Sequence, residues 1–152
     1  DGTAFFMTSN AEVPPSSLVQ NLNHNKVLHR KNVLLSVQIE GVPYIEEAAR
    51  DHIEVLNDEF TLLIIRYGFK DEIDLQHELL RLSRRHDKDI HFDWEDTSLF
   101  LSRRALRPDP RYGLPAWQDF IYVFMHRHAT EPSDYYRLPA SRVIEIGRQV
   151  FV

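Results

Sequence analysis

Runs of apolar residues separated by polar stretches recur along the chain, and their spacing predicts the strands of a sheet. The first run, Ala4–Met7, has no polar interruption, which is typical of a strand buried on both faces. Two prolines and two serines at 14–17 then predict the start of a helix, because proline is pre-set for the first turn and serine can bond its unpaired amides. The next apolar run, 33–40, follows closely, so residues 3–40 predict a strand–helix–strand unit with parallel strands and a right-handed crossover.

Two further runs, 52–56 and 60–68, predict a β-hairpin because the turn residues Asn57, Asp58 and Glu59 separate them. The first run alternates polar and apolar residues, as an edge strand does. The second carries Leu62–Ile65 without interruption, which indicates a strand deeper in the sheet. We therefore predict a hairpin over residues 52–68.

A helix is predicted over residues 71–85, where Leu75, Leu79 and Leu82 recur at steps of four and three residues. Exposed ion pairs contribute little to stability, so we interpret the helix charges as solvated surface. These charges belong to Asp71, Glu72, Asp74, Arg81, Arg84 and Arg85.

Residues 44–50 predict a loop or one helical turn, and the runs 97–103 and 142–152 predict two more strands. Helices and strands alternate along much of the chain, which is typical of an α/β protein. The sequence therefore predicts one α/β domain spanning residues 1–152. Its mixed sheet of about six strands has helices on both faces, and its first two strands are parallel.

The most apolar helix is predicted after the proline-containing loop 107–113. Its apolar side chains recur at three- and four-residue steps and, with Tyr122 and Val123, spread around the cylinder, so it must be covered nearly all round. The cover is the domain's own sheet, a second copy of the domain, or another part of a longer chain. We predict an interface formed by Trp117, Phe120, Ile121, Phe124 and Met125.

Composition narrows the class of protein. The chain has 152 residues, which suits one domain, and no apolar stretch is long enough to span a bilayer. A net charge of -5 argues against nucleic acid or an anionic membrane surface as a partner, because both usually need a basic face. The absence of cysteine excludes disulfides and thiolate chemistry. No signal peptide is expected, since the opening residues already predict a core strand.

The residues show no pattern typical of catalysis or of a metal site. His126 and His128 are two residues apart on a predicted helix and so point to different faces, while His86 and His91 flank a loop without a recognisable ligand set. There is no nucleophile elbow and no phosphate-binding glycine loop, and the carboxylate pairs are merely adjacent in sequence. We therefore predict neither an enzyme nor a bound metal or cofactor.

One candidate binding site remains, at the carboxyl end of the first strand. In open α/β sheets ligands bind in this crevice, and the amides of the helix that begins there favour phosphate. A second polar cluster, at the far end of that helix, contributes only if a loop or another subunit brings it near. The alternative is structural, because these residue types routinely end strands and helices. The candidate ligand-binding residues are Thr8, Ser9, Asn10, Asn23, His24, Asn25 and Lys26.

Several strings of residues together form a specific pattern. The most specific is Asn21–His29, read Asn-Leu-Asn-His-Asn-Lys-Val-Leu-His, which follows the opening residues 2–9 and Val13-Pro14-Pro15. This region resembles the start of the C-terminal region of bacterial Kup potassium transporters, of the KUP/HAK/KT family. The resemblance extends to Val152, with departures at Arg148 and Phe151–Val152. Further matching strings lie at 66–69, 96–101, 136–139 and 142–147.

The resemblance implies a function that composition and spacing do not. Members of this family carry potassium inward with protons across the cytoplasmic membrane, through a multi-helix membrane part that precedes this region. The chain would then be the soluble cytosolic tail of an inner-membrane protein, a regulatory or assembly domain that contacts the membrane part and forms a homodimer. Some relatives respond to cyclic di-adenosine monophosphate, so the alternative is a module that senses this cyclic dinucleotide or an adenine nucleotide.

Overall fold

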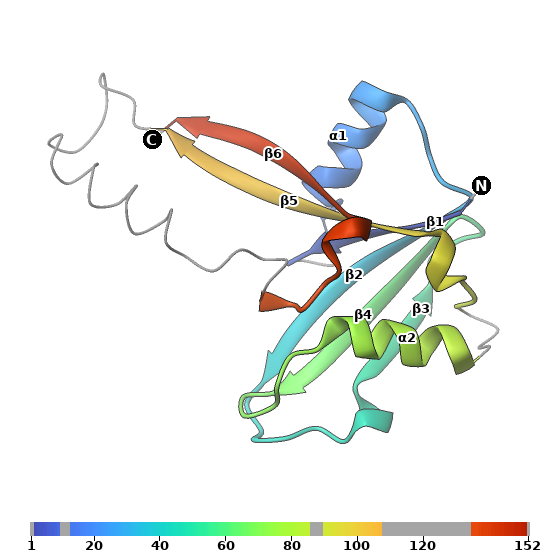
Figure 1. Ribbon diagram of the computed structural model, residues 1–152, viewed down its shortest axis with the longest axis vertical. Helices are drawn as coiled ribbons and strands as arrows, with labels where there is room; N and C mark the ends of the chain where they lie inside the picture. The colour runs from blue at the N-terminus through green and yellow to red at the C-terminus, as the bar shows by residue number, and fades with distance from the viewer. Residues whose placement is uncertain (1, 10–12, 86–89, 108–134, 152) are drawn as a thin grey trace, which may run out of the picture.

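A computed structural model describes residues 2–9, 13–85, 90–107 and 135–151 (Figure 1). These residues form one six-stranded sheet in the order β3-β4-β2-β1-β5-β6. Only β3 is antiparallel to its neighbour, so the predicted α/β class and mixed sheet are confirmed. The strands are β1 (Thr3–Thr8), β2 (Lys31–Glu40), β3 (Asp51–Val55), β4 (Phe60–Gly68), β5 (Thr97–Arg107) and β6 (Val143–Phe151).

Strand β1 lies near the middle of the sheet, between two parallel partners. Phe5 pairs with Val33 of β2, and Phe6 pairs with Phe100 of β5. Ala4, Phe5 and Phe6 expose 0% of their surface, which confirms a strand buried on both faces. The predicted parallel pairing of the first two strands is also confirmed.

The predicted hairpin lies at one edge of the sheet, where β3 is the outermost strand. Strand β3 pairs antiparallel with β4, from Asp51 opposite Ile65 to Val55 opposite Thr61. The Asn57 side chain fixes the turn, because its Oδ1 accepts hydrogen bonds from the amides of Glu59 and Phe60 at 2.9 and 2.8 Å. The hairpin and the edge position of its first strand are confirmed.

One face of the sheet packs against helix α2 (Leu75–Arg85). Leu75, Leu79 and Leu82 of α2 are buried against side chains from β1, β2, β4 and β5, and this cluster also contains Trp94 of the short helix η2 (Trp94–Asp96). The helix begins after Asp74, whose carboxylate accepts a hydrogen bond from the amide of His77 at 2.9 Å. This face holds the larger of the two core clusters.

The opposite face packs against helix α1 (Ser16–Asn25), where Leu18 joins Ala4, Phe6 and Leu34 in the second cluster. Helices therefore cover both faces, as predicted. The start of α1 differs from the prediction in one respect: Pro15 occupies the N-cap, and among the described residues no serine side chain caps the helix. The predicted serine cap is wrong because the proline lies one position before the first turn instead of within it.

Strands β5 and β6 extend beyond the end of β1 as a two-stranded parallel ribbon (Figure 1). Strand β1 pairs with β5 only through Phe100, whereas β6 pairs with β5 from Leu99 to Arg107. Strand β5 is thus longer than the predicted run 97–103. The predicted loop after Arg107 and the predicted apolar helix, with its interface residues Trp117 to Met125, lie outside the described residues.

Short 3₁₀ helices fill two connections. Helix η1 (Glu47–Ala49) precedes β3, so of the loop and the single turn predicted for residues 44–50 the structure has the turn, and η3 (Ala140–Arg142) precedes β6. None of the helices in the described part of the chain is long and apolar enough to cross a membrane.

Candidate functional site

The predicted binding residue Thr8 is the last residue of β1 and lies on the face covered by α1. Its partner in β2 is Ser36. Both lie on the α1 face because each follows by two positions a residue of the α1-side cluster, Phe6 or Leu34. Ser9 is exposed after the strand, and Asn10 lies outside the described residues.

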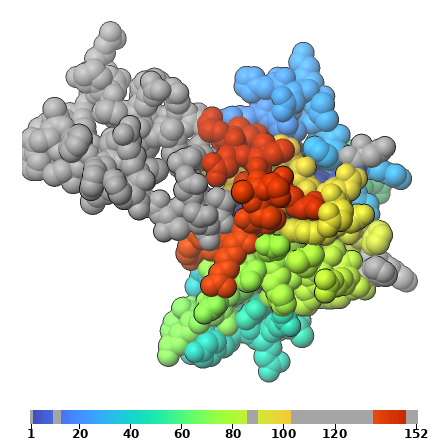
Figure 2. Space-filling model, viewed as in Figure 1, coloured from blue at the N-terminus to red at the C-terminus, as the bar shows by residue number. Residues whose placement is uncertain are grey.

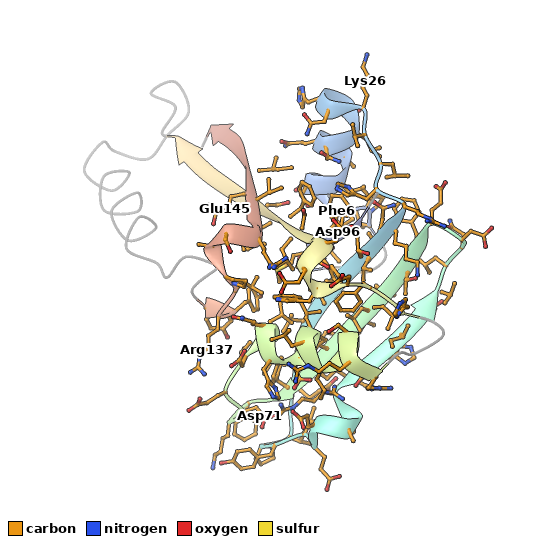
Figure 3. The ribbon with its side chains drawn as sticks, turned by 45° about the vertical axis from the view of Figure 1, so that its right-hand side comes forward. Phe6, Lys26, Asp71, Asp96, Arg137 and Glu145 are labelled. Atoms are coloured by element: carbon orange, nitrogen blue, oxygen red, sulfur yellow. The ribbon has the colours of Figure 1, made fainter. Side chains whose placement is uncertain are left out.

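The rest of the predicted set lies at the other end of α1. Asn23, His24 and Asn25 form its last turn and Lys26 is its C-cap, and the four residues are exposed. Since α1 has 10 residues, about 15 Å separates its two ends. Figure 3 shows Lys26 projecting from the far end of the helix, away from Phe6 of β1. The structure does not bring the two halves of the predicted set together.

Two buried hydroxyl groups on the α1 side of the sheet were missed by the sequence reasoning. Ser17, in the first turn of α1, and Ser36 are 0% and 1% exposed, and neither Oγ has a hydrogen-bond partner among the described residues. A buried polar group without a partner is destabilising and rare in folded proteins. The sequence offered one signal for such a buried hydroxyl: Ser36 is a polar residue within the apolar run 33–37.

A different group of side chains joins α2 to the hairpin. We call it the α2 charge network. Its centre is Glu78, whose side chain is only 1% exposed. One Glu78 oxygen accepts a hydrogen bond from Arg50 at 2.8 Å, and the other accepts one from Arg81 at 2.9 Å. The network consists of three arginines and three carboxylates: Arg50, Asp51, Asp71, Glu78, Arg81 and Arg85.

The outer carboxylates extend the network in two directions. Asp51 of β3 lies 2.7 Å from Arg81 and 2.8 Å from Arg85, so it ties the edge strand to α2. Asp71 lies 3.1 Å from Arg50, and its second oxygen accepts hydrogen bonds from the amides of Gly68 and Ile45 at 2.7 and 3.0 Å. The network thereby holds the start of β3 and the end of β4, at the open end of the hairpin, against α2.

The charges in this network change the pKa values of its members. Burial alone would raise the pKa of Asp51, but the hydrogen bond from Arg81 and the charge of Arg85 outweigh it and hold that pKa below its ordinary value. The amides of Gly68 and Ile45, with Arg50, lower the pKa of Asp71. Burial and the charge of Glu78 raise the pKa of Tyr67, whose ring centroid lies 5.0 Å from the Arg50 guanidinium carbon.

The helix predicted from residue 71 begins only at Leu75. The prediction that its charges are solvated surface is wrong for Asp71, which precedes the helix, and for Arg81. Their side chains expose only 7% and 19% of their surface, because β3 and the 3₁₀ turn before it pack beside α2. Spacing within one helix could not show this, since Asp51 and Arg50 come from a distant part of the sequence. Arg84 and Glu72 are exposed, as predicted.

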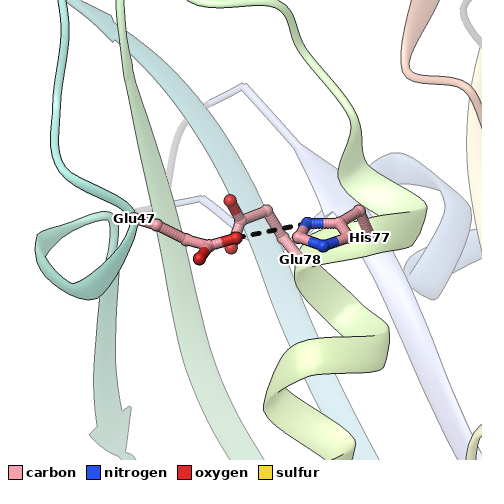
Figure 4. A group of neighbouring side chains, drawn as sticks. All are labelled: Glu47, His77 and Glu78. Carbon is pink, nitrogen blue, oxygen red and sulfur yellow. Dashed lines mark ion pairs between the residues drawn. The ribbon is translucent and has the colours of Figure 1, made fainter.

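Glu47, His77 and Glu78 place one ligand atom each within 4.8 Å of one another (Figure 4). His77 Nδ1 lies 3.3 Å from Glu47 Oε1, and both side chains are largely exposed. Both oxygens of Glu78, however, already accept hydrogen bonds from arginine, and a cation there would meet two positive guanidinium groups. We therefore assign Glu78 to the charge network and not to a metal site.

Comparison with known proteins decides the family. The family model of the K+ potassium transporter C-terminal domain matches residues 1–152. The chain belongs to this family. This match confirms the resemblance to Kup-type transporters that Asn21–His29 and the other matching stretches indicated.

Several relatives carry the name of a potassium transport protein. The chain is 40% identical over 151 residues to the probable potassium transport system protein Kup 3 of Sinorhizobium medicae, covering 99% of this chain and 23% of that protein. It is 39% identical to the Kup protein of Caulobacter vibrioides, covering 22% of that protein, and 40% identical to that of Rhizobium tropici, covering 70%. The chain thus spans about a quarter of the length of most of these relatives. No solved structure matches it.

The strings that carry the family resemblance occupy structural positions in this K+ transporter C-terminal domain. Asn21 is buried, and its side-chain amide donates to the carbonyl of Val27 at 2.9 Å while its oxygen accepts a hydrogen bond from Asn25 at 2.7 Å. These bonds close the turn around Lys26, whose φ of 53° is left-handed. Similarly, Arg142 donates to the carbonyls of Trp94 and Glu95 at 2.6 and 2.8 Å and fixes η3 against η2.

Proposed function

We propose that this chain is the regulatory and assembly domain of a potassium–proton symporter of the cell membrane, on its cytoplasmic side. The observation that supports this most directly is the family match over residues 1–152, together with relatives named potassium transport proteins of which the chain spans about 23%. The potassium pathway would then lie in the part of such a protein that this chain does not include. The domain would act through its surfaces.

The arrangement of charges supports a role without catalysis. The most buried carboxylate in the α2 charge network, Glu78, uses both oxygens to bind arginine. A catalytic acid or base needs an oxygen that can reach a substrate proton. The network instead holds the hairpin against α2, which gives the domain a rigid surface for contacts with other parts of the transporter.

Removal of the domain tests this proposal. A transporter from which residues 1–152 are deleted is expressed in cells that have no other potassium uptake system. Its potassium uptake should be reduced, or should no longer change with external potassium. Immunoblots of the membrane fraction must show equal protein amounts. Unchanged uptake and unchanged adjustment at equal protein amount would refute the proposed role.

The proposed domain forms a homodimer. Support comes from the sequence, because a helix as apolar as the predicted one must be covered nearly all round, and the sequence pattern predicts Trp117 and Phe124 on its apolar side. Sedimentation velocity on the 152-residue chain should show a dimer that Phe124→Ser converts to a monomer, while exposed His52→Ser leaves it unchanged. A wild-type chain that remains monomeric at high concentration would refute pairing through this domain.

A nucleotide sensor is the second candidate. The observation in its favour is that the hydroxyls of Ser17 in α1 and of Ser36, the β2 partner of Thr8, have no hydrogen-bond partner among the described residues. The first amides of α1 lack a side-chain cap and could bind a phosphate oxygen. Calorimetric titration with cyclic di-adenosine monophosphate and with ATP should release heat that Ser17→Ala reduces. No heat with either nucleotide at millimolar concentration would remove this candidate.

A further inference from the structure

Large apolar side chains are exposed together at the carboxyl ends of β2 and β4. We call this surface the apolar tip and define it by Ile39, Val42, Tyr44 and Phe69, which expose 52%, 47%, 67% and 57% of their surface. Ile39 lies in β2, and the turns after β2 and β4, which carry the other three residues, lie side by side at the lower left of Figures 1 and 2. Exposed apolar groups that gather in one place mark interaction sites.

Backbone hydrogen bonds hold the two turns of the tip together. The amide of Phe69 donates to the carbonyl of Val42 at 2.9 Å, and the amide of Lys70 donates to the carbonyl of Pro43 at 2.9 Å. Asp71 of the α2 charge network binds the amides of Gly68 and Ile45 from the inner side. The exposed apolar side chains therefore project from a fixed backbone, which reduces the entropy lost when a partner binds.

Gly68 makes this close approach possible. A Cβ atom at this position would lie 2.4 Å from the carbonyl oxygen of Pro43, which is too close for any other residue. The chain thus carries a glycine at the point where a side chain would push the two turns apart. The exposed apolar residues lie in both turns, Val42 and Tyr44 in one and Phe69 in the other. The local structure keeps these residues exposed.

The exposed charges of the turn after β2 are acidic. Glu46 and Glu47 are exposed there, with His77 3.3 Å from Glu47. In the turn after β4, Lys70 is an exposed base and the exposed Glu72 pairs with Arg137 at 3.2 Å. The whole chain also has a net charge of -5. An anionic lipid surface would be repelled by this negative charge, whereas a protein segment with apolar residues flanked by lysine or arginine would be attracted.

We propose that the apolar tip binds a Lys/Arg-rich amphipathic loop of the membrane part of the same transporter. This proposal rests on the proposed function. The chain spans about 23% of several relatives, so most of such a transporter lies outside this domain. Cytoplasmic loops of membrane proteins carry an excess of lysine and arginine, which is complementary to the exposed Glu46 and Glu47. Binding through this tip couples the position of the domain to that of the membrane part.

A site-specific photo-crosslink in the full-length transporter tests this proposal. p-Benzoylphenylalanine at Phe69 should crosslink, in membranes, to a peptide of the same chain that precedes residue 1 of this domain and is rich in lysine and arginine. The same probe at Leu56 is the matched control, because that residue is 47% exposed at the opposite end of the hairpin. We expect at least a tenfold higher yield from Phe69, and a several-fold loss on Glu46→Lys and Glu47→Lys together.

Each other outcome overturns the proposal. These outcomes are crosslinks only to lipid, crosslinks only to the tip of a second copy, capture of a different protein, and equal yields from Phe69 and Leu56. The double substitution Tyr44→Ser and Phe69→Ser removes exposed groups and so preserves folding, and it should abolish the crosslink from a probe at Val42. Because the readout is a contact and not potassium uptake, it remains informative if the deletion of residues 1–152 has no effect on transport.

Discussion

The Glu78 carboxylate lies 2.8 Å from the Arg50 guanidinium while only 1% of the Glu78 side chain is exposed. Its other oxygen lies 2.9 Å from Arg81, so one buried acid joins the segment before β3 to the middle of α2. Removal of one member of a buried ion pair leaves the remaining charges without compensation. The pair should therefore matter more for stability than exposed pairs in the same domain.

Glu78→Gln should lower the free energy of unfolding by about 3 kcal/mol, because Arg50 and Arg81 would then lie partly buried without a carboxylate. Urea denaturation monitored by circular dichroism measures this change. Glu72→Gln is the control: that side chain is 81% exposed in its pair with Arg137, and we expect a change below about 0.5 kcal/mol. Equal effects of the two substitutions would contradict the structural role of Glu78.

Asp51 should make the stability of the domain depend on pH. Its pKa is below the ordinary value of 3.8, so the folded state favours the charged form. The resulting stabilisation is present above pH 3.8 and is lost as the pH falls through the lower pKa of the folded state. The difference in unfolding free energy between wild type and Asp51→Asn should therefore be largest near neutral pH and shrink below about pH 4.

Urea titrations at a series of pH values measure this difference. Asp58→Asn, at an exposed position in the hairpin turn, provides the control and should give a small difference at each pH. A difference for Asp51→Asn that stays constant from neutral pH to acid would show that the contacts of Asp51 with arginine do not depend on its charge.

Gly68→Ala should destabilise the domain by about 2 kcal/mol or more, since the added Cβ would lie 2.4 Å from the carbonyl oxygen of Pro43 and force the two turns apart. Gly41→Ala is a matched control, because a Cβ there has no atom within 4 Å. Thermal unfolding should show a melting temperature lower by about 4 °C or more for Gly68→Ala only. Equal melting temperatures would mean that the turns are not held closely together.

Asn21→Ala should loosen the end of α1. The substitution removes the bond to the Val27 carbonyl and the acceptor of Asn25, with a loss of about 1–2 kcal/mol. Hydrogen exchange at the amides of residues 22–28 should accelerate severalfold, while exchange in β1 stays unchanged. Asn23→Ala, at an exposed position of the same helix, should leave these rates as they are. Unchanged exchange in Asn21→Ala would contradict the assigned turn.

The strands could be predicted from sequence because their signal is local. Ala4–Met7 is an uninterrupted apolar run, and Leu62–Ile65 is another, so burial in a sheet followed directly from the pattern. The strand order could not be predicted, since nothing local indicates that β5 pairs with β1 and that β6 then joins β5. The α2 charge network was missed for a related reason: Arg50 and Glu78 are paired only after the hairpin packs beside the helix.

The candidate site was predictable in part. The sequence predicted that the first strand ends near Thr8, and β1 does end there, but the position of Ser36 beside Thr8 depends on the parallel register between β1 and β2. Asn23, His24, Asn25 and Lys26 were grouped with Thr8 because their residue types are polar, although the length of α1 separates them. Residue type indicated which side chains could bind a ligand, but the topology determined which of them are neighbours.

The parallel ribbon of β5 and β6 has a consequence for the order in which the domain is made. A translating ribosome releases β1 to β5 before β6, and parallel pairing across a long connection requires closure of a large loop. Until β6 arrives, the outer edge of β5 presents unpaired amides and carbonyls from Leu99 to Arg107, the kind of edge at which other chains add. A nascent chain stalled before Val143 should therefore be the species that chaperones bind and that aggregates.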